Sequence, residues 1–446
     1  MKTLKYFSFI LFLVISFLSC KKESYVAKFD QSPQERMNAQ MTLVSDALTG
    51  APNGWIATLP TGLGGGYGFY MAFDKEQKVT MYADLTDASA STAASSQYRI
   101  RQDMGALLSF DTYTYISILN NPEPSAFGGN IREGFRSDID FVFDRASGDS
   151  LVFIGKRYRQ ALILVKASAE QKAKYLNGDL KPAIDKLKQF FTNNPNAYFE
   201  NGPLKVSVEP NGGNSLNAGK RITLTAITPD DAIITSSAKF AYTIDQMAIL
   251  DSGLKFDGIT FKRLAWKDAN TLALYDSNGK EYILKNNPTP LLPLYKLWGS
   301  KYNGMLSDFK KINPGTSAKG AEILNFFHNN MQNGFTGFVF NYGRINFVWN
   351  TVNKRLNFNG FSSQNGGTSG WTTTSVYNYT VDASGVYTFT LNSSFSGGYV
   401  SKAMQPLHDF LLKNKVKFDY FVDGTTIYGQ MSSVDDPTIV MTYVLQ

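Results

Sequence analysis

The feature that most constrains the fold is an alternation of apolar and polar residues in short stretches, which clusters of Gly, Asp, Asn and Pro separate. Side chains along a β-strand point alternately to opposite faces, so a period of two indicates strands with one buried face. In the first third of the chain the pattern predicts strands over residues 66–74, 77–84, 97–102, 106–111, 113–118, 137–144, 149–155 and 159–165. No helical pattern separates these stretches, which favours an antiparallel barrel or sandwich.

The same alternation returns twice further along the chain. Between residues 203 and 284 it predicts strands that include 219–227, 239–244, 259–264, 271–275 and 280–284. In the last part it predicts strands near 336–341, 344–350, 354–358, 374–379, 386–392, 415–421, 425–430 and 439–444. Phe, Tyr and Trp make up 14% of the chain, and their flat side chains pack well on pleated sheets. We therefore predict a mainly β protein with accessory α-helices, built from antiparallel barrel or sandwich modules.

Four segments carry helical signals. Ser32 and Glu35 match a capping box, and an apolar stripe of helical period follows as far as Leu48. A second capping-box pattern begins at Ser168, and helical periodicity runs on from it with a break at Gly178. Two further helical patterns lie near residues 318–331 and 401–413.

These patterns divide the chain into modules. Residues 1–19 are expected to be a signal peptide and residues 20–28 a lipidated tether. An N-terminal helix plus an antiparallel β module is expected over 29–166, a helix plus β module over 167–290, and a C-terminal β and helix module over 291–446. The boundary near 290 rests on three closely spaced prolines, which are typical of a connector, and residues 167–446 could instead form one domain.

The N-terminus has the pattern of a secretion signal. An apolar run of twelve residues follows Lys2 and Lys5, which is too short to span a bilayer core that needs about 20 residues. The run ends in Leu18-Ser19-Cys20, which resembles a bacterial lipobox, and Cys20 is the only Cys of the chain. This resemblance implies cleavage before Cys20 and lipid attachment to it. Several acyl chains, at about 0.8 kcal/mol per buried CH₂ group, would then anchor the protein in the outer membrane, on its periplasmic or its cell-surface side.

Composition excludes several function classes. Removal of residues 1–19 takes away two lysines, so the formal net charge falls from +7 to +5, and no basic block or recognition motif points to nucleic acid. One Cys and two His exclude a disulfide framework, a Cys-based metal cage and a mechanism built on several imidazoles. We expect no cofactor and no metal.

Several short motifs follow one another in the first module. They include Phe29-Asp30, Asn53-Gly54-Trp55, Gly65-Gly66-Tyr67, Ser96-Gln97-Tyr98-Arg99, Leu108-Ser109-Phe110-Asp111, Asp140-Phe141 and Gly155-Lys156. Their order resembles the Bacteroidota lipoproteins of domain-of-unknown-function family 4302. The resemblance implies a protein encoded beside the pairs of outer-membrane transporter and binding lipoprotein that import glycans, peptides or other nutrients. It implies no catalytic residues.

Candidate catalytic groups are few. Asp138 and Asp140 lie two apart on a predicted strand and would share one face, with Cα atoms about 7 Å apart. That spacing falls in the window of about 6.5–9.5 Å for the carboxyl pair of an inverting glycosidase, but a solvated strand face produces it as well. His328 is expected to contact the last carbonyls of its helix, and His408 faces away from Asp409.

A polar loop near the C-terminus differs from these groups. Residues 365–370 form a flexible Asn-, Gly- and Ser-rich loop, Trp371 follows it, and Tyr377 and Tyr379 lie nearby. An aromatic ring beside a polar loop can serve as a platform for a sugar ring or a peptide side chain. In the alternative, slightly favoured, Trp371 turns inward and anchors the core.

The function that these observations favour is that of a lipid-anchored outer-membrane accessory protein. It would not be an enzyme, and it would bind a glycan or peptide ligand, or a transporter component, during nutrient uptake. A carboxylate-dependent hydrolase and a purely structural partner of a transporter are the alternatives.

Overall fold

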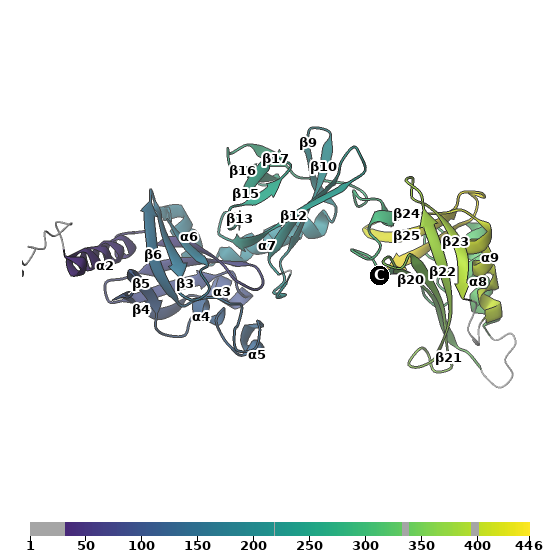
Figure 1. The fold of residues 1–446 in the computed structure, drawn as a ribbon, viewed down its shortest axis with the longest axis horizontal. Helices are drawn as coiled ribbons and strands as arrows, with labels where there is room; N and C mark the ends of the chain where they lie inside the picture. Colours follow the sequence, from purple (N-terminus) through teal and green to yellow (C-terminus); the bar gives the residue numbers. More distant parts are fainter. Residues whose placement is uncertain (1–31, 218, 332–338, 394–400) are drawn as a thin grey trace, which may run out of the picture. The chain divides into compact units, whose positions relative to one another are not determined.

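The computed structural model describes residues 32–217, 219–331, 339–393 and 401–446 (Figure 1). Within these residues the strands form three antiparallel sheets, which follow one another along the chain, and the first and third sheets are closed barrels. Residue contacts divide the chain into unit 1, Met1–Leu63 with Tyr67–Gly178, and unit 2, Gly64–Gly66 with Asp179–Gln446. The prediction of a mainly β protein with antiparallel modules is confirmed.

Unit 1 contains an eight-stranded barrel whose strands lie side by side in chain order. Its strands are β1 (Trp55–Pro60), β2 (Gly66–Phe73), β3 (Lys78–Ala83), β4 (Ala94–Gln102), β5 (Ala106–Phe110), β6 (Asp140–Ser147), β7 (Ser150–Gly155) and β8 (Ala161–Lys166). β1 pairs with β8 from Trp55 opposite Lys166 to Thr58 opposite Ile163, which closes the barrel. Large apolar side chains fill the core, among them Trp55, Phe69 and Phe153, all fully buried.

Five helices accompany this barrel among the described residues. They are α2 (Pro33–Thr49), α3 (Asp87–Ser91), α4 (Tyr115–Ile118), α5 (Pro124–Phe127) and α6 (Ala169–Leu176). The capping box of α2 is confirmed: the Glu35 backbone N–H donates to Ser32 Oγ at 3.2 Å, and the Ser32 backbone N–H donates to Glu35 Oε2 at 2.7 Å. The capping box of α6 at Ser168 is also present.

The predicted strand at 113–118 is wrong, because these residues enter the short helix α4. The backbone N–H of Thr114 donates to Ser117 Oγ at 2.7 Å, and Ile116 and Leu119 are both buried at helical spacing. α3, α4 and α5 also contradict the expectation that no helices separate the strands. Helices of four or five residues are too short to show a period of 3.6 in the sequence.

Unit 2 begins with α7 (Leu180–Asn193) and a sheet in the order β17-β16-β15-β13-β12-β11-β10-β9-β18, with β14 paired to β15. The strands are β9 (Ala197–Asn201), β10 (Leu204–Asn211), β11 (Arg221–Ile227), β12 (Ile233–Tyr242), β13 (Gln246–Ile249), β14 (Leu254–Phe256), β15 (Ile259–Trp266), β16 (Leu272–Asp276), β17 (Glu281–Ile283) and β18 (Lys285–Asn286). The helix break predicted at Gly178 is confirmed, and its φ of 81° is one that glycine adopts readily.

A second eight-stranded barrel, which we call the C-terminal barrel, completes unit 2. Its strands are β19 (Gly304–Ser307), β20 (Tyr342–Asn350), β21 (Arg355–Ser363), β22 (Trp371–Val381), β23 (Val386–Ser393), β24 (Val416–Asp423), β25 (Thr426–Ser433) and β26 (Val440–Leu445). A short 3₁₀ turn, Leu294–Lys296, precedes it. The helices α8 (Ala318–Asn330) and α9 (Ser401–Lys413) lie side by side against this barrel (Figure 1). Of the predicted strand 336–341, residues 336–338 lie outside the described part, and 339–341 are not strand.

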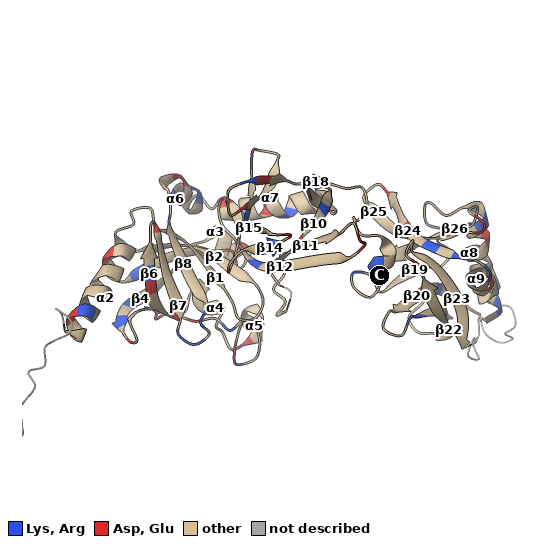
Figure 2. Cartoon of the chain, turned by 45° about the horizontal axis from the view of Figure 1, so that its top comes forward, with Lys and Arg blue, Asp and Glu red and all other residues tan. Residues whose placement is uncertain are grey.

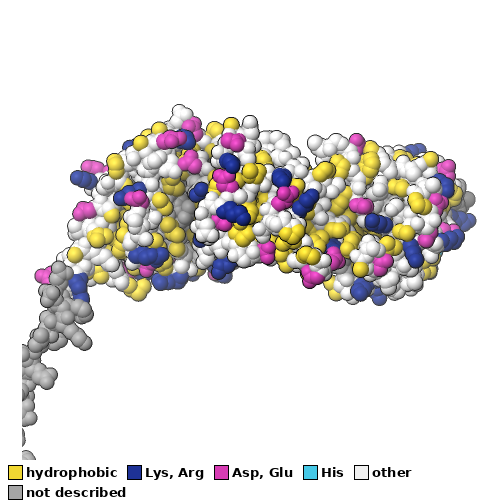
Figure 3. Space-filling model, turned by 90° about the horizontal axis from the view of Figure 1, so that it is seen from above, with side chains coloured by type: hydrophobic (Ala, Val, Ile, Leu, Met, Phe, Trp, Pro, Cys, Tyr) yellow, Lys and Arg dark blue, Asp and Glu magenta, His cyan; other side chains and the backbone are white. Residues whose placement is uncertain are grey.

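Charged side chains of both signs are interspersed along the described elements (Figure 2), and one face of the space-filling view shows the same mixture (Figure 3). No described helix combines the length and the apolar character that crossing a membrane requires.

Candidate functional site

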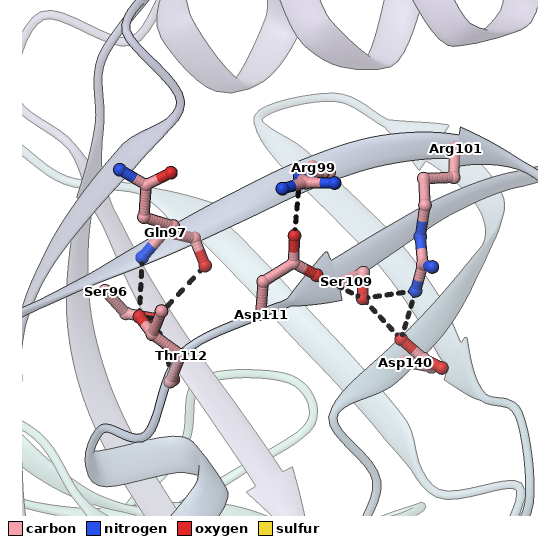
Figure 4. Close-up of polar contacts among 8 residues, drawn as sticks. All are labelled: Ser96, Gln97, Arg99, Arg101, Ser109, Asp111, Thr112 and Asp140. Carbon is pink, nitrogen blue, oxygen red and sulfur yellow. Dashed lines mark hydrogen bonds and ion pairs between the residues drawn. The ribbon is translucent and has the colours of Figure 1, made fainter.

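A network of polar side chains joins three neighbouring strands of the unit 1 barrel (Figure 4). Its members come from β4, from β5 and the two residues that follow it, and from the start of β6. We call this set the barrel network: Ser96, Gln97, Arg99, Arg101, Ser109, Asp111, Thr112 and Asp140. The strand register brings them together, since β5 pairs with both β4 and β6.

Ser109 lies at the centre of the barrel network and is buried. Arg101 Nη2 donates to Ser109 Oγ at 2.6 Å and to Asp140 Oδ1 at 3.2 Å. Ser109 Oγ lies 2.6 Å from Asp140 Oδ1 and 3.0 Å from Asp111 Oδ1. A hydroxyl has one proton, so Ser109 donates to one carboxylate at a time, and the shorter distance favours Asp140. These bonds tie β4, β5 and β6 to one another.

The rest of the barrel network fixes the chain that leaves β5. Arg99 Nε pairs with Asp111 Oδ2 at 2.7 Å, and such partly exposed ion pairs contribute about 0–1 kcal/mol each. Thr112 Oγ1 accepts the backbone N–H of Gln97 at 2.9 Å and lies 3.0 Å from Ser96 Oγ. The barrel network is therefore largely satisfied from within.

Asp138 and Asp140, the acidic pair considered for catalysis, have different structural roles. β6 begins only at Asp140, so the prediction that Asp138 and Asp140 share a strand face is wrong. Asp138 is buried, its Oδ1 accepts the backbone N–H of Arg157 at 2.9 Å, and its Oδ2 accepts that of Tyr158 at 2.9 Å. A Cβ atom at Gly155 would lie 2.2 Å from Asp138 Oδ2, which explains the glycine there. Asp138 thus holds the turn after β7.

We expect Asp138→Asn to destabilise the unit 1 barrel by about 1–3 kcal/mol, because the amide NH₂ group would face a backbone N–H that now has an acceptor. Asp140→Asn is the matched control, and its cost should be smaller because Asp140 is partly exposed and Asn Oδ1 still accepts a bond. Urea unfolding of the mature chain measures both. Equal midpoints for Asp138→Asn and wild type would contradict this role of Asp138.

Of the two histidines, His328 is buried and His408 is half-buried. His328 packs edge-on against Phe309 and Phe327, and neither of its ring nitrogens has a hydrogen-bond partner among the described residues. The predicted contact with the last carbonyls of α8 is therefore wrong. Burial lowers the pKa of His328 to about 4, so the ring is neutral at neutral pH. His408 Nδ1 lies 2.6 Å from Tyr377 Oη, and burial lowers the pKa of His408.

The three aromatic residues predicted as a ligand platform all lie on β22 but have different surroundings. Tyr377 and Tyr379 are buried members of the core of the C-terminal barrel. Trp371, the first residue of β22, is 36% exposed and meets the Phe340 ring edge-on at 6.0 Å between centroids. The structure does not bring the three rings to one surface, and Trp371 alone is accessible.

The loop before Trp371 is held by hydrogen bonds, contrary to the expectation of a flexible loop. Asn365 Oδ1 accepts the Ser369 backbone N–H at 3.0 Å, and Asn365 Nδ2 donates to Ser369 Oγ at 2.8 Å. Ser363 Oγ accepts the backbone N–H of Gly367 at 3.0 Å. The loop therefore presents the indole of Trp371 in a defined position.

A cavity of about 480 Å³ lies within unit 2, lined by residues of β10, β11 and β12 and by the segment 290–301. Its two lysines already have acidic partners: Lys296 Nζ pairs with Asp231 Oδ2 at 2.6 Å, and Lys301 Nζ pairs with Glu209 Oε1 at 3.2 Å. Across the described part of the chain, no three His, Cys, Asp or Glu side chains gather in a way that could hold a metal ion.

The fold and these sites define a protein of two up-and-down β-barrels, a class whose eight-stranded members are filled by side chains or hold one small ligand. The family model described as Domain of unknown function (DUF4302) matches residues 27–268, more than half of the 446-residue chain. The chain belongs to this family, which confirms the resemblance seen in its motifs. The match runs beyond the unit 1 barrel as far as β15. No curated protein matches the chain.

The motifs that carried the resemblance supply most of the barrel network. Ser96, Gln97 and Arg99 belong to one of them, Ser109 and Asp111 to another, and Asp140 begins a third. Apart from Asp140, which was considered as half of a carboxyl pair, the sequence alone assigned no role to these residues, because their proximity depends on the pairing of β4, β5 and β6.

Proposed function

We propose that the protein is a lipid-anchored accessory protein of the outer membrane that binds a ligand or a transporter component during nutrient uptake and is not an enzyme. The observation that carries this proposal is the sequence Leu18-Ser19-Cys20 at the end of a short apolar run, with Cys20 as the only Cys. Cys20 lies outside the described residues.

Two features of the fold support a binding role. The C-terminal barrel exposes Trp371 at the start of β22, and hydrogen bonds within the preceding loop hold that loop in place. A loop ordered before binding loses less conformational entropy when a ligand or protein docks on it. Tyr377 and Tyr379, which lie in the core, support the position of β22 and take no part in the proposed contact.

Trp371→Ala should weaken binding more than it weakens folding. Because about one third of the side chain is exposed, we expect a loss of about 1–2 kcal/mol of stability, less than the 3–5 kcal/mol typical of a buried Trp. Trp349→Ala is the control for the buried case, since Trp349 is 5% exposed and stacks on Trp298 at 3.9 Å. Urea midpoints of the three proteins measure this difference.

The same variants test the function. Mature protein is immobilised and used to capture transporter components from detergent-solubilised outer membranes, and glycan and peptide panels are titrated in parallel. Loss of the Trp371 ring should weaken the interaction by about 1–3 kcal/mol, as for aromatic hot spots. Capture without any soluble ligand would favour the purely structural partner. Unchanged binding by Trp371→Ala, or a loss of stability equal to that of Trp349→Ala, would contradict the role of Trp371.

A further inference from the structure

A second cavity, in unit 1, adjoins the barrel network. Its volume is about 380 Å³, and its walls come from the chain before and at the start of β6 and from the turn after β7. The lining residues are Asn120, Ser137, Asp138, Ile139, Asp140, Lys156 and Arg157. Asp140 belongs both to the cavity and to the barrel network, where it contacts Ser109 and Arg101 (Figure 4). The volume lies in the range of about 300–1,000 Å³ found for small-molecule sites.

Ser137 is the observation that points to a ligand. Its side chain is 1% exposed, and its Oγ has no hydrogen-bond partner among the described residues. Buried hydroxyl groups in native proteins nearly always have a partner, which can be a bound molecule where the protein supplies none. Ser137 lines the cavity, so a molecule in the cavity can supply the missing partner.

Other walls of the cavity keep hydrogen-bonding capacity. Both hydrogen bonds that the Asp140 carboxylate makes within the described part of the chain go to Oδ1, which leaves Oδ2 as an acceptor. Arg157 is exposed, lies over the ring of Tyr158 at 4.8 Å, and makes no ion pair with a described residue. The Asn120 amide can donate and accept. Asp138 is different, because two backbone N–H groups occupy its carboxylate.

The charges of the lining residues indicate which class of ligand the cavity can bind. Asp138 and Asp140 balance Lys156 and Arg157, and Lys156 is paired with Asp103. A cavity with no net charge favours neither an anion nor a cation. Its free groups are a hydroxyl, an amide, a carboxylate oxygen and a guanidinium, which together offer both donors and acceptors. Ile139 adds an apolar contact for C–H groups. A neutral molecule with many hydroxyl groups matches this set.

We infer that this cavity binds a sugar unit of a neutral glycan. The inference rests on the proposed role in nutrient uptake and names the ligand class and its site. Ser137 Oγ and Arg157 would bond to sugar hydroxyls, and Asp140 Oδ2 would accept from one.

Isothermal titration of the full mature chain in detergent tests the site. The probes are neutral malto-, cello-, xylo- and galacto-oligosaccharides, with inorganic phosphate and oligogalacturonate as anionic arms. We expect one neutral series to bind the wild-type protein. Its affinity should be about three- to tenfold lower for Ser137→Ala and at least about tenfold lower for Arg157→Met. Ser125→Ala and Arg145→Met are matched controls on exposed residues outside the cavity, and they should bind like wild type.

Ser137→Ala has a second readout. Removal of a hydroxyl without a protein partner should leave the urea midpoint unchanged or raise it, so weaker binding by this variant would not result from unfolding. The inference is overturned if no neutral oligosaccharide binds, if only the anionic probes bind, or if Ser137→Ala and Arg157→Met bind like wild type. If no sugar binds while capture of transporter components persists, this inference fails and the proposed function stands. Sugar binding that depends on Ser137, in a protein absent from the outer membrane, would instead support the cavity and contradict the proposed anchoring.

Discussion

Removal of helix α6 is expected to abolish cooperative folding of the unit 1 barrel. A fragment of residues 27–166 ends with β8 and lacks α6, whereas a fragment of residues 27–178 contains it. Tyr175 of α6 is fully buried, and its ring stacks on that of Tyr70 at 4.9 Å. Loss of a large buried aromatic side chain costs about 3–5 kcal/mol, a large part of the roughly 5–15 kcal/mol that stabilises a domain. Thermal unfolding followed by circular dichroism compares the two fragments.

Point variants of the full chain give the same comparison without truncation. Tyr175→Ala should cost about 3–5 kcal/mol. Leu176→Ala, one residue further on the same helix, should cost little because Leu176 is 56% exposed. Equally cooperative melting of both fragments, or equal midpoints for the two variants, would show that α6 does not complete the core.

The expected module boundary at residue 166 was placed just before the capping box at Ser168. A capping box marks where a helix begins, but it does not show whether the helix belongs to the preceding or to the following module. The box at Ser168 marks the start of α6 correctly. Whether that helix packs on the preceding barrel or on the following sheet depends on where Tyr175 lies, and the local pattern has no bearing on that. Residue contacts assign α6 to unit 1.

Local sequence patterns predicted most helices and strands, but they could not predict whether the strands close into a barrel. In the C-terminal barrel, strands from β20 to β26 appear where alternation indicates them, within a few residues. Barrel closure depends on pairs such as Trp55 with Lys166, which lie far apart in the sequence. Such long-range pairing has no local signal, so the sequence left barrel and sandwich as alternatives.

The candidate sites show the same division. Trp371, Tyr377 and Tyr379 are separated by even numbers of residues, so on a regular strand they point to the same face. Thr373 and Ser375 lie between them on that face. Both are buried, so the inward face of β22 carries hydroxyl groups as well as rings, and apolar alternation alone did not identify Tyr377 and Tyr379 as core residues. The cavity at Ser137 was missed altogether, because its walls come from three separate segments and none forms a motif.

Cys20→Ser is expected to move the protein from the membrane fraction to the soluble or unprocessed fraction completely. Several acyl chains contribute about 0.8 kcal/mol for each buried CH₂ group, which is far more than the folded chain's own polar surface could replace. Ser19→Ala is the matched control, because it keeps a small residue before the Cys and should leave anchoring intact. Persistence of Cys20→Ser in outer membranes, released only by detergent, would contradict the lipid anchor.

The most direct test of the lipid anchor is mass spectrometry of the N-terminal peptide of the native protein purified from outer membranes. The predicted result is a peptide that begins at Cys20 and carries acyl groups on the thiol-linked glycerol and on the amino group. A peptide that begins at another residue, or at an unmodified Cys20, would contradict the proposal that this barrel protein works from a lipid anchor.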